Sequence, residues 1–353
     1  MKRIGAFVGL LFAVPLWGIP TYARRYNKSC IECHVGYPKL TYRAERFKYN
    51  NYLPQNYNPR MKTVAFRKDQ RIYLPMEPPV SFRFRAFVGL LSQNGKMGTY
   101  GEVGGNLFAS YNLSSLSSFY VAADYFTGAL RSPYSVSSLL RDAFLSFSLP
   151  AASKVIVGKY DLSEFFIKRS TRLTYANFVA YDRGDLMGTG VALSLTPYFQ
   201  AGVFDFNGGR AFIRAGANTK YFGFGVMAVP VDGAQRYSLE IRTRFAFLDL
   251  FAITVLGANQ KLGKFDLKDT TTFITGTYGL DLTFGRIFTS LLYNYVGGLD
   301  RSTMPVDHLS LLTWALGFYP VSNLRVMLES GYNFAASFPA DNTYTGFVID
   351  WSF

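Results

Sequence analysis

From Val80 onward, apolar and polar side chains alternate along the chain with a period of two. In the first such stretch, apolar residues such as Phe82 fall on one side, and Arg83 and Arg85 fall on the other. The same alternation recurs between residues 237 and 247. Successive side chains of a β-strand point to opposite faces, so the pattern predicts strands with one apolar and one charged face. Such strands are typical of a transmembrane barrel, whose apolar face meets lipid and whose polar face lines the lumen.

About sixteen segments carry this pattern, and an even number is the rule in bacterial single-chain barrels. We therefore expect an all-β fold in which residues 80–353 form an antiparallel transmembrane β-barrel of about 16 strands. The expected strands are 80–91, 99–112, 117–129, 139–149, 153–163, 187–196, 198–206, 210–220, 222–231, 236–247, 249–260, 270–283, 286–297, 308–319, 323–335 and 344–353.

The connections between these strands alternate between short and long. The short ones are 150–152, 196–197, 248–249, 285 and 320–323. The long ones are 130–138, 164–186, 261–269, 298–307 and 336–343. Outer-membrane barrels have short periplasmic turns and longer extracellular loops, so the long connections are expected outside the cell. The chain ends on Phe353 after an aromatic-rich alternation, which resembles the terminal signature of outer-membrane barrels.

The composition agrees with a barrel. The chain has 353 residues, of which 33 are Phe and 25 are Tyr but only 3 are Trp. Charged residues make up 17%, below the ~25% of soluble domains. No internal segment offers roughly 18 uninterrupted apolar residues, so a bundle of membrane helices is not expected.

The N-terminus has the pattern of a secretory signal peptide. Two basic residues precede the apolar run Ile4 to Trp17, which is followed by small residues. We expect residues 1–23 to be the signal, with cleavage near Gly18 or Ala23. Export through the secretory pathway would take the chain to the outer membrane.

Residues 24–79 form a leader that is rich in Tyr, Asn, Pro and basic residues. A short helix is expected from Leu40 to Lys48, with Thr41 as its N-cap. The remaining leader is expected to be mostly irregular, because Asn and Pro favour turns. A segment of this size is marginal on its own, so it needs a cofactor or the barrel wall as support.

The net charge of the chain is +14, and most of it lies near the N-terminus. Residues 24–85 hold 14 Lys and Arg against four acidic residues. Nucleic acid is the usual partner of such a segment, but export argues against it. Haem propionates, an acidic barrel wall or an acidic periplasmic electron acceptor suit the charge better.

Residues 30 to 34 read Cys-Ile-Glu-Cys-His, and the chain has no other cysteine. The spacing C-x-x-C-H is that of c-type haem attachment. Cys30 and Cys33 would form the two thioethers, and His34 would reach the iron as proximal ligand. A redox C-x-x-C pair or a lone disulfide is the alternative, but the adjacent His34 and the signal sequence argue against it. The motif occurs once, so one covalently attached haem c is expected.

The residues around this motif resemble a known family. Pro20 to Arg24 precede the motif, Tyr37 to Leu40 follow it, and Arg46 to Tyr52 come next. In this order the leader resembles the fused monohaem cytochrome–porins of iron-oxidising bacteria. The resemblance implies an iron oxidase-type electron-transfer oxidoreductase. It would take electrons from extracellular Fe(II) through one haem and pass them to a periplasmic carrier such as a soluble cytochrome.

Distance constrains where such a haem can lie. The hydrocarbon core of a bilayer is about 30 Å thick, and electron tunnelling decays exponentially with distance. A single haem therefore serves as a conduit only if it lies well inside the lumen. We expect residues 24–79 to form a plug in the barrel rather than a tethered periplasmic domain.

Two further sets of ligands follow from this interpretation. Met76 and Met61 are the candidates for the distal haem ligand, although either can simply fill a gap in the packing. Carboxylates at the outer loops are candidates for an Fe(II) entry site, because hard cations prefer oxygen ligands. These residues are Asp161, Glu164, Asp182, Asp185, Asp300 and Asp307, with His308 beside them. Each also fits a solvated loop charge, and His308 fits a rim histidine.

Two other functions remain open from the residues alone. One is a solute-diffusion porin whose haem-bearing plug gates or stabilises it. The other is an electron conduit that serves a different extracellular donor or acceptor. Solute flux through the reconstituted protein separates the first of these from a plugged conduit.

Overall fold

The computed structural model describes residues 33–36, 39–49, 63–66, 69–75, 80–93, 96–114, 116–127, 140–150, 153–162, 167, 172–176, 187–196, 198–205, 210–231, 234–258, 272–298, 308–334 and 343–352.

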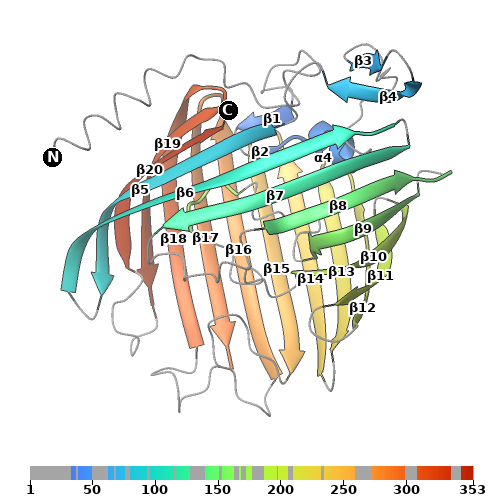
Figure 1. The fold of residues 1–353 in the computed structure, drawn as a ribbon. Coiled ribbons are helices and arrows are strands. Elements are labelled where there is room, and N and C mark those ends of the chain that lie inside the picture. The colour runs from blue at the N-terminus through green and yellow to red at the C-terminus, as the bar shows by residue number, and fades with distance from the viewer. Residues whose placement is uncertain are drawn as a thin grey trace.

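Sixteen antiparallel strands form one closed barrel (Figure 1). They are β5 (Val80–Gln93), β6 (Lys96–Asn112), β7 (Ser117–Thr127), β8 (Leu140–Ser148), β9 (Lys154–Asp161), β10 (Met187–Thr196), β11 (Phe199–Asp205), β12 (Arg210–Asn218), β13 (Phe222–Val231), β14 (Ala234–Phe245), β15 (Leu248–Ala258), β16 (Thr272–Phe284), β17 (Ile287–Gly297), β18 (His308–Val321), β19 (Leu324–Asn333) and β20 (Tyr344–Ser352). The last strand pairs with the first, with Val348 opposite Phe87, so the sheet has no free edge. The predicted fold class is confirmed, and each expected strand is present with ends that differ by at most three residues.

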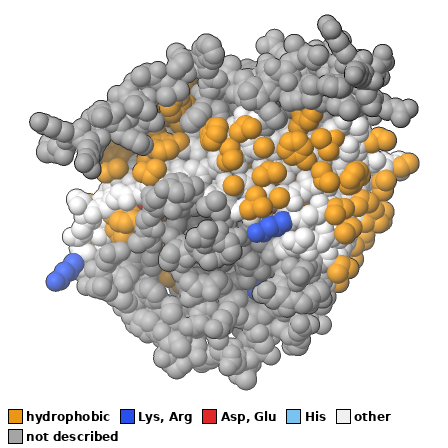
Figure 2. Space-filling view, viewed as in Figure 1, with side chains coloured by type: hydrophobic (Ala, Val, Ile, Leu, Met, Phe, Trp, Pro, Cys, Tyr) orange, Lys and Arg blue, Asp and Glu red, His pale blue; other side chains and the backbone are white. Residues whose placement is uncertain are grey.

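The two faces of each strand are those that the alternation predicts. Phe82 and Val88 point outward and are 47% and 65% exposed, whereas Arg83 and Arg85 are 4% and 1% exposed. Figure 2 shows the apolar side chains gathered over the outer wall of the barrel. The outer surface is thus the apolar band of a transmembrane barrel. No helix in the described part of the chain is long and apolar enough to cross a membrane.

The short connections lie together at one end of the barrel (Figure 1). In the turn from β16 to β17, Gly285 has a φ of 58°, a left-handed conformation that glycine adopts without steric cost. The turn from β14 to β15 lies at Ala246 and Phe247, not at 248–249 as predicted. As a result Asp249 belongs to β15 and faces the lumen, where it is 4% exposed.

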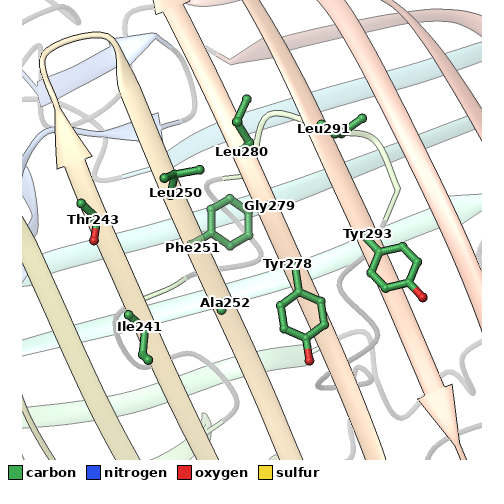
Figure 3. Close-up of a pocket in the computed structure, with 10 residues that line it drawn as sticks. All are labelled: Ile241, Thr243, Leu250, Phe251, Ala252, Tyr278, Gly279, Leu280, Leu291 and Tyr293. Atoms are coloured by element: carbon green, nitrogen blue, oxygen red, sulfur yellow. The ribbon is translucent and has the colours of Figure 1, made fainter.

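One groove of about 390 Å³ lies on the outer wall across β14 to β17 (Figure 3). On the lumen side of the same strands the ring of Phe251 covers Gly279, and a Cβ at that glycine would lie 2.1 Å from the ring. In the groove itself, the rings of Tyr278 and Tyr293 stack with their centroids 6.1 Å apart. Most side chains of the groove, such as those of Leu250, Tyr278 and Leu291, belong to the outward face of the barrel.

The described leader contains two small units. β1 (His34–Gly36) pairs with β2 (Lys39–Leu40), and α4 (Tyr42–Tyr49) follows. The backbone N–H of Ala44 donates to Thr41 Oγ1 at 3.2 Å, so the predicted helix and its N-cap are confirmed. A second unit pairs β3 (Thr63–Phe66) with β4 (Asp69–Pro75). This hairpin is not among the predicted elements, because the turn-forming residues around it outweighed two short runs of β-forming residues.

The connection from β9 to β10 differs from the prediction. Residues 164–186 were expected outside the cell, but Ile167 and residues 172–176 lie inside the barrel against its wall. We call the described part of this connection, Leu162, Ile167 and residues 172–176, the inner loop. Its apolar side chains explain its position, since Leu162 and Leu173 are 0% and 1% exposed and burial of apolar surface favours the inward fold.

Candidate functional site

Cys33 and His34, the described residues of the Cys-x-x-Cys-His motif, lie at β1, which Figure 1 shows at the short-turn end of the barrel. His34 begins β1 and pairs with Leu40 of β2. The backbone N–H of Thr41 donates to the carbonyl of Cys33 at 2.8 Å. Cys33 and His34 are half-buried, and Cys30 lies outside the described residues. The first turn of α4 therefore fixes the backbone of the motif.

Lys39 ties the leader to two neighbouring strands of the barrel. Its Nζ lies 2.8 Å from Asp249 Oδ2 on β15 and 2.8 Å from Asp281 Oδ2 on β16. Ser290 Oγ donates to the other oxygen of Asp281 at 2.5 Å. The side chains of Lys39 and both aspartates are 5–6% exposed. A buried ammonium between two carboxylates is compensated from both sides, as a buried charge requires.

Glu45 ties α4 to the other side of the same mouth. Its Oε1 lies 2.7 Å from Arg242 Nη1, and its Oε2 lies 3.0 Å from Arg244 Nη2. The amide of Asn218, the last residue of β12, also donates to Glu45 Oε2 at 3.0 Å. Arg242 in turn reaches Asp249, with Nη2 2.5 Å from Oδ2.

These contacts join into one chain of six charges that alternate in sign. In order they are Asp281, Lys39, Asp249, Arg242, Glu45 and Arg244. We call this set the docking network. The leader supplies one cation and one anion, and the barrel supplies the rest. Asp281 lies three residues before the end of β16, so Lys39 reaches about 10 Å into the lumen at ~3.3 Å per residue.

The inner loop is held to β19 and β14 by its backbone. The N–H groups of Tyr175 and Ala176 donate to the two carboxylate oxygens of Glu329 on β19, at 2.5 and 2.9 Å. The hydroxyl of Tyr344 donates to the same carboxylate at 2.6 Å. Further along the loop, the N–H of Ile167 donates to Glu240 at 3.0 Å. The wall therefore supplies acceptors that satisfy the buried backbone of the loop.

An arginine pair supports the same loop nearer the short-turn end. Arg325 Nη1 donates to the carbonyl of Leu173, and its Nη2 lies 2.7 Å from Asp350. Arg83 Nη2 reaches the same Asp350 oxygen at 2.6 Å. The Arg325 and Asp350 side chains are 0% exposed. One carboxylate thus balances two cations beneath the loop.

Apolar side chains also hold the inner loop against the barrel wall. The ring of Tyr175 stacks on Phe87 with centroids 5.5 Å apart, and Tyr344 meets Phe87 edge-on at 5.7 Å. Leu173 belongs to the same buried cluster as Phe288 and Tyr319. A second cluster joins Ile167 to lumen-facing residues of seven strands. The described part of the inner loop is therefore packed against the lumen face of the wall.

The other predicted site residues are only partly described. Asp161 ends β9 and is 9% exposed, and its backbone N–H donates to Asp142 Oδ1 at 3.0 Å. His308 begins β18 at the predicted rim, where it is exposed and stacks on Tyr295 at 6.3 Å. Outside the described residues lie Met61, Met76, Glu164, Asp182, Asp185, Asp300 and Asp307. Among the described residues, no three His, Cys, Asp or Glu side chains gather as a metal site.

Sequence reasoning missed the residues that dock the two inserts. Lys39 and Glu45 belong to a generally basic leader, and no local sequence pattern distinguishes them from its other charged residues. Asp249 was placed in a turn, which hid its partnership with Lys39. The inner loop carried a usable signal, because its sequence around Ile167 and Leu173 is more apolar than an exposed loop requires.

Comparisons with known proteins bear on this architecture. No family model and no curated protein matches the chain. Among solved structures, the chain is similar to Salmonella typhi OmpF in complex with daunomycin, with a TM-score of 0.58 and 10% identity over 78% of this chain and 97% of that one. The low-pH structure of Pseudomonas putida OprB gives a TM-score of 0.53 and 11% identity, over 78% and 92% of the two chains. This chain has the fold of an outer-membrane porin.

A third porin-like barrel, the outer-membrane channel DcaP of Acinetobacter baumannii, gives a TM-score of 0.51 at 11% identity over 78% of this chain and 95% of that one. At such identities the likeness concerns the fold. The likeness and the apolar outer band together place the barrel in the outer membrane. The short turns then face the periplasm, so the docking network lies at the periplasmic mouth of the barrel.

Proposed function

We propose that this outer-membrane porin-like barrel is a cytochrome–porin. It takes electrons from extracellular Fe(II) through one covalent haem and passes them to a periplasmic carrier. The observation that carries the proposal is the Cys-Ile-Glu-Cys-His motif at residues 30–34, followed at once by a segment that buried ion pairs hold in the barrel mouth. A c-type attachment motif has little use in a porin that only passes solutes.

The donor set fits a c-type haem. Cys30 and Cys33 supply thiols at the required spacing, and His34 supplies the adjacent imidazole. Cys33 and His34 are half-buried beside the lumen wall, so their side chains are sheltered yet not enclosed by the described residues. When bound, the haem supplies a one-electron couple whose potential depends on its axial ligands and surroundings. Met61 and Met76 remain the candidates for its second axial ligand.

The residues of the chain have distinct tasks in this proposal. Lys39 and Glu45 hold the motif at a fixed depth in the periplasmic mouth. The inner loop, held by Glu329 and Arg325, restricts the lumen above it. A periplasmic carrier can therefore approach the motif from one side, while bulk solutes from the other side are excluded.

The outer end is proposed to receive the reductant. Carboxylates are the ligands that divalent iron accepts from a protein surface, and Asp161 and His308 lie at strand ends away from the short turns. Glu164, Asp182, Asp185, Asp300 and Asp307 remain candidates from the sequence. The apolar outer wall meets membrane lipid, and residues 1–23 direct export. Another extracellular donor or acceptor would use the same conduit.

A second candidate is a solute-diffusion porin whose haem-bearing leader stabilises the barrel. The likeness of the fold to porins favours it. The inward position of the inner loop disfavours it, because a loop that shares two buried apolar clusters with the wall narrows the lumen. The conductance of the purified protein in planar bilayers separates the two: a diffusion porin gives a large, steady conductance, and the conduit gives little.

The direct test adds Fe(II) to the purified oxidised protein and follows the reduced haem band in the visible spectrum. We expect the band to rise, and the rise to be absent in Cys33→Ser because that variant carries no covalently attached haem. A haem-loaded protein that Fe(II) leaves oxidised contradicts iron as the donor. A Cys33→Ser protein that still stains for covalent haem contradicts the attachment site.

A further inference from the structure

Arg244 has donors that its known partners do not use. It is the last lumen-facing residue of β14, and its side chain is 12% exposed. Its Nη2 serves Glu45 and Asn218, the latter at 2.8 Å. Its Nε and Nη1 are fully buried, and no described residue lies within hydrogen-bond distance of either atom. Buried donors of a guanidinium without an acceptor cost free energy, so the site calls for an additional acceptor.

The positive charge of the Arg244 guanidinium determines which kind of acceptor binds it best. Glu45 already shares its carboxylate between Arg242, Arg244 and the amide of Asn218. Three cations face three carboxylates in the docking network, so its charges balance, yet Nε and Nη1 of Arg244 still lack an acceptor. A guanidinium pairs best with carboxylate or phosphate oxygens. The acceptor expected at Nε and Nη1 of Arg244 is therefore an oxyanion.

The location narrows the source of that oxyanion. Arg244 faces the lumen, on the opposite side of the wall from lipid headgroups. Its Cζ lies 5.8 Å from the ring centroid of Tyr42, and Tyr42 follows Thr41, whose N–H is bonded to the carbonyl of Cys33. One side chain therefore separates Arg244 from the backbone that carries the attachment motif. A haem joined to Cys30 and Cys33 brings two carboxylates, its propionates, to this neighbourhood.

We propose that Arg244 binds a propionate carboxylate of the haem through Nε or Nη1, which makes it a positioning residue for the cofactor. The inference rests on the proposed function, because it requires a haem at Cys30 and Cys33. A fixed cation beside the propionate cancels negative charge that would otherwise favour the oxidised, more positive iron. Arg244 thereby raises the reduction potential of the haem.

The test measures the haem midpoint potential of the full-length, haem-loaded protein. Arg244→Gln is expected to shift the equilibrium about tenfold toward oxidised haem, which corresponds to ~59 mV for one electron. It should also change the propionate bending modes in the resonance Raman spectrum. Arg286→Gln, in the exposed turn between β16 and β17 and outside the docking network, removes the same charge and should leave both readouts unchanged.

Further variants distinguish cofactor binding from leader docking. Glu45→Gln weakens docking but keeps Nε and Nη1 of Arg244, so the propionate modes should stay as in the wild type. Arg244→Lys keeps the charge and should recover most of the potential, and it serves as the working variant if Arg244→Gln does not retain haem. Unchanged potential and propionate modes in Arg244→Gln, with full haem content, overturn the assignment.

A titration with inorganic phosphate separates a propionate from a dissolved anion. If Arg244 holds the propionate, phosphate leaves the potential of the wild-type protein unchanged. If phosphate shifts that potential and has no effect on Arg244→Gln, the site takes free anions and the propionate assignment is wrong. Failure of the proposed function looks different, because wild-type protein then carries no covalent haem at all.

Discussion

Two segments enter the lumen of this barrel, and they are held by different physics. The leader docks through charged side chains, which alternate in sign from Asp281 to Arg244. The inner loop docks through backbone N–H and carbonyl groups and through apolar rings such as Tyr175 on Phe87. The loop is therefore packed like a core, whereas the leader is pinned at a few points.

The difference teaches what each segment can tolerate. Apolar packing accepts many side chains of similar size. A buried ion pair does not tolerate the loss of one partner, which costs about 3–5 kcal/mol because the other charge is left uncompensated. The leader thus gains a defined position from few residues, which suits the role proposed for it. The inner loop instead gains a continuous apolar contact with the wall.

The strongest test of this contrast is Lys39→Glu. The substitution places three carboxylates together where Lys39 now joins Asp249 and Asp281. The expected cost exceeds the about 3–5 kcal/mol of a broken buried pair, so the leader should leave the mouth while the barrel stays closed. Limited proteolysis of the purified protein should then cut the leader, and heat-modifiable migration of the barrel on gels should persist.

Arg43→Glu is the matched control, because Arg43 lies on the same short helix with an exposed side chain. It should leave the leader as resistant as in the wild type. Adding Asp281→Lys to Lys39→Glu should restore part of the protection by rebuilding one pair with reversed sign. Equal cleavage of Lys39→Glu and the wild type would show that the docking network does not hold the leader.

A smaller effect is expected at the inner loop, from Glu329→Gln. The carboxylate of Glu329 accepts from Tyr175, Ala176 and Tyr344, and an amide offers one acceptor oxygen without the charge. Hydrogen bonds to a charged group contribute about 1.5–3 kcal/mol, and the apolar seat of the loop remains. The loop should open part of the time, which appears as brief conductance steps in planar bilayers.

Glu102→Gln controls for the loss of a lumen charge. Glu102 is equally buried, at 1% exposure, and faces the lumen from β6, where Tyr100 donates to it at 3.3 Å. Its substitution should leave the conductance low. If both variants conduct alike, the effect comes from lumen charge and the loop is not the seal.

The sequence predicts the barrel and the N-cap of α4 much better than it predicts the contacts that dock the leader. Strict alternation made the barrel visible, because a period of two reports which face each residue of a strand occupies. The N-cap of α4 was visible for a similar reason, since Thr41 acts on its own helix. The partnership of Lys39 with Asp249 and Asp281 joins residues more than 200 positions apart, and no local pattern encodes such a contact.

The inner loop lies between these cases. Its length and position after β9 were apparent, but loops are usually solvated, and that expectation placed it outside the cell. Its apolar residues, Ile167 and Leu173 among them, argued for burial. The apolar composition of a long barrel loop therefore indicates its position, as alternation does for the strands.

The smallest expected effect concerns the N-cap of α4 in the leader. Thr41 caps α4 through its hydroxyl and holds Cys33 through its backbone N–H. Thr41→Ala removes only the first contact, at a cost of about 1 kcal/mol, so the docking network and the motif should stay in place. Hydrogen exchange at the first amides of α4 should rise about fivefold, and Thr41→Ser, which keeps the hydroxyl, should exchange as the wild type does. A loss of leader protection as large as that of Lys39→Glu would mean that the helix cap, and not the buried charges, determines where the leader sits.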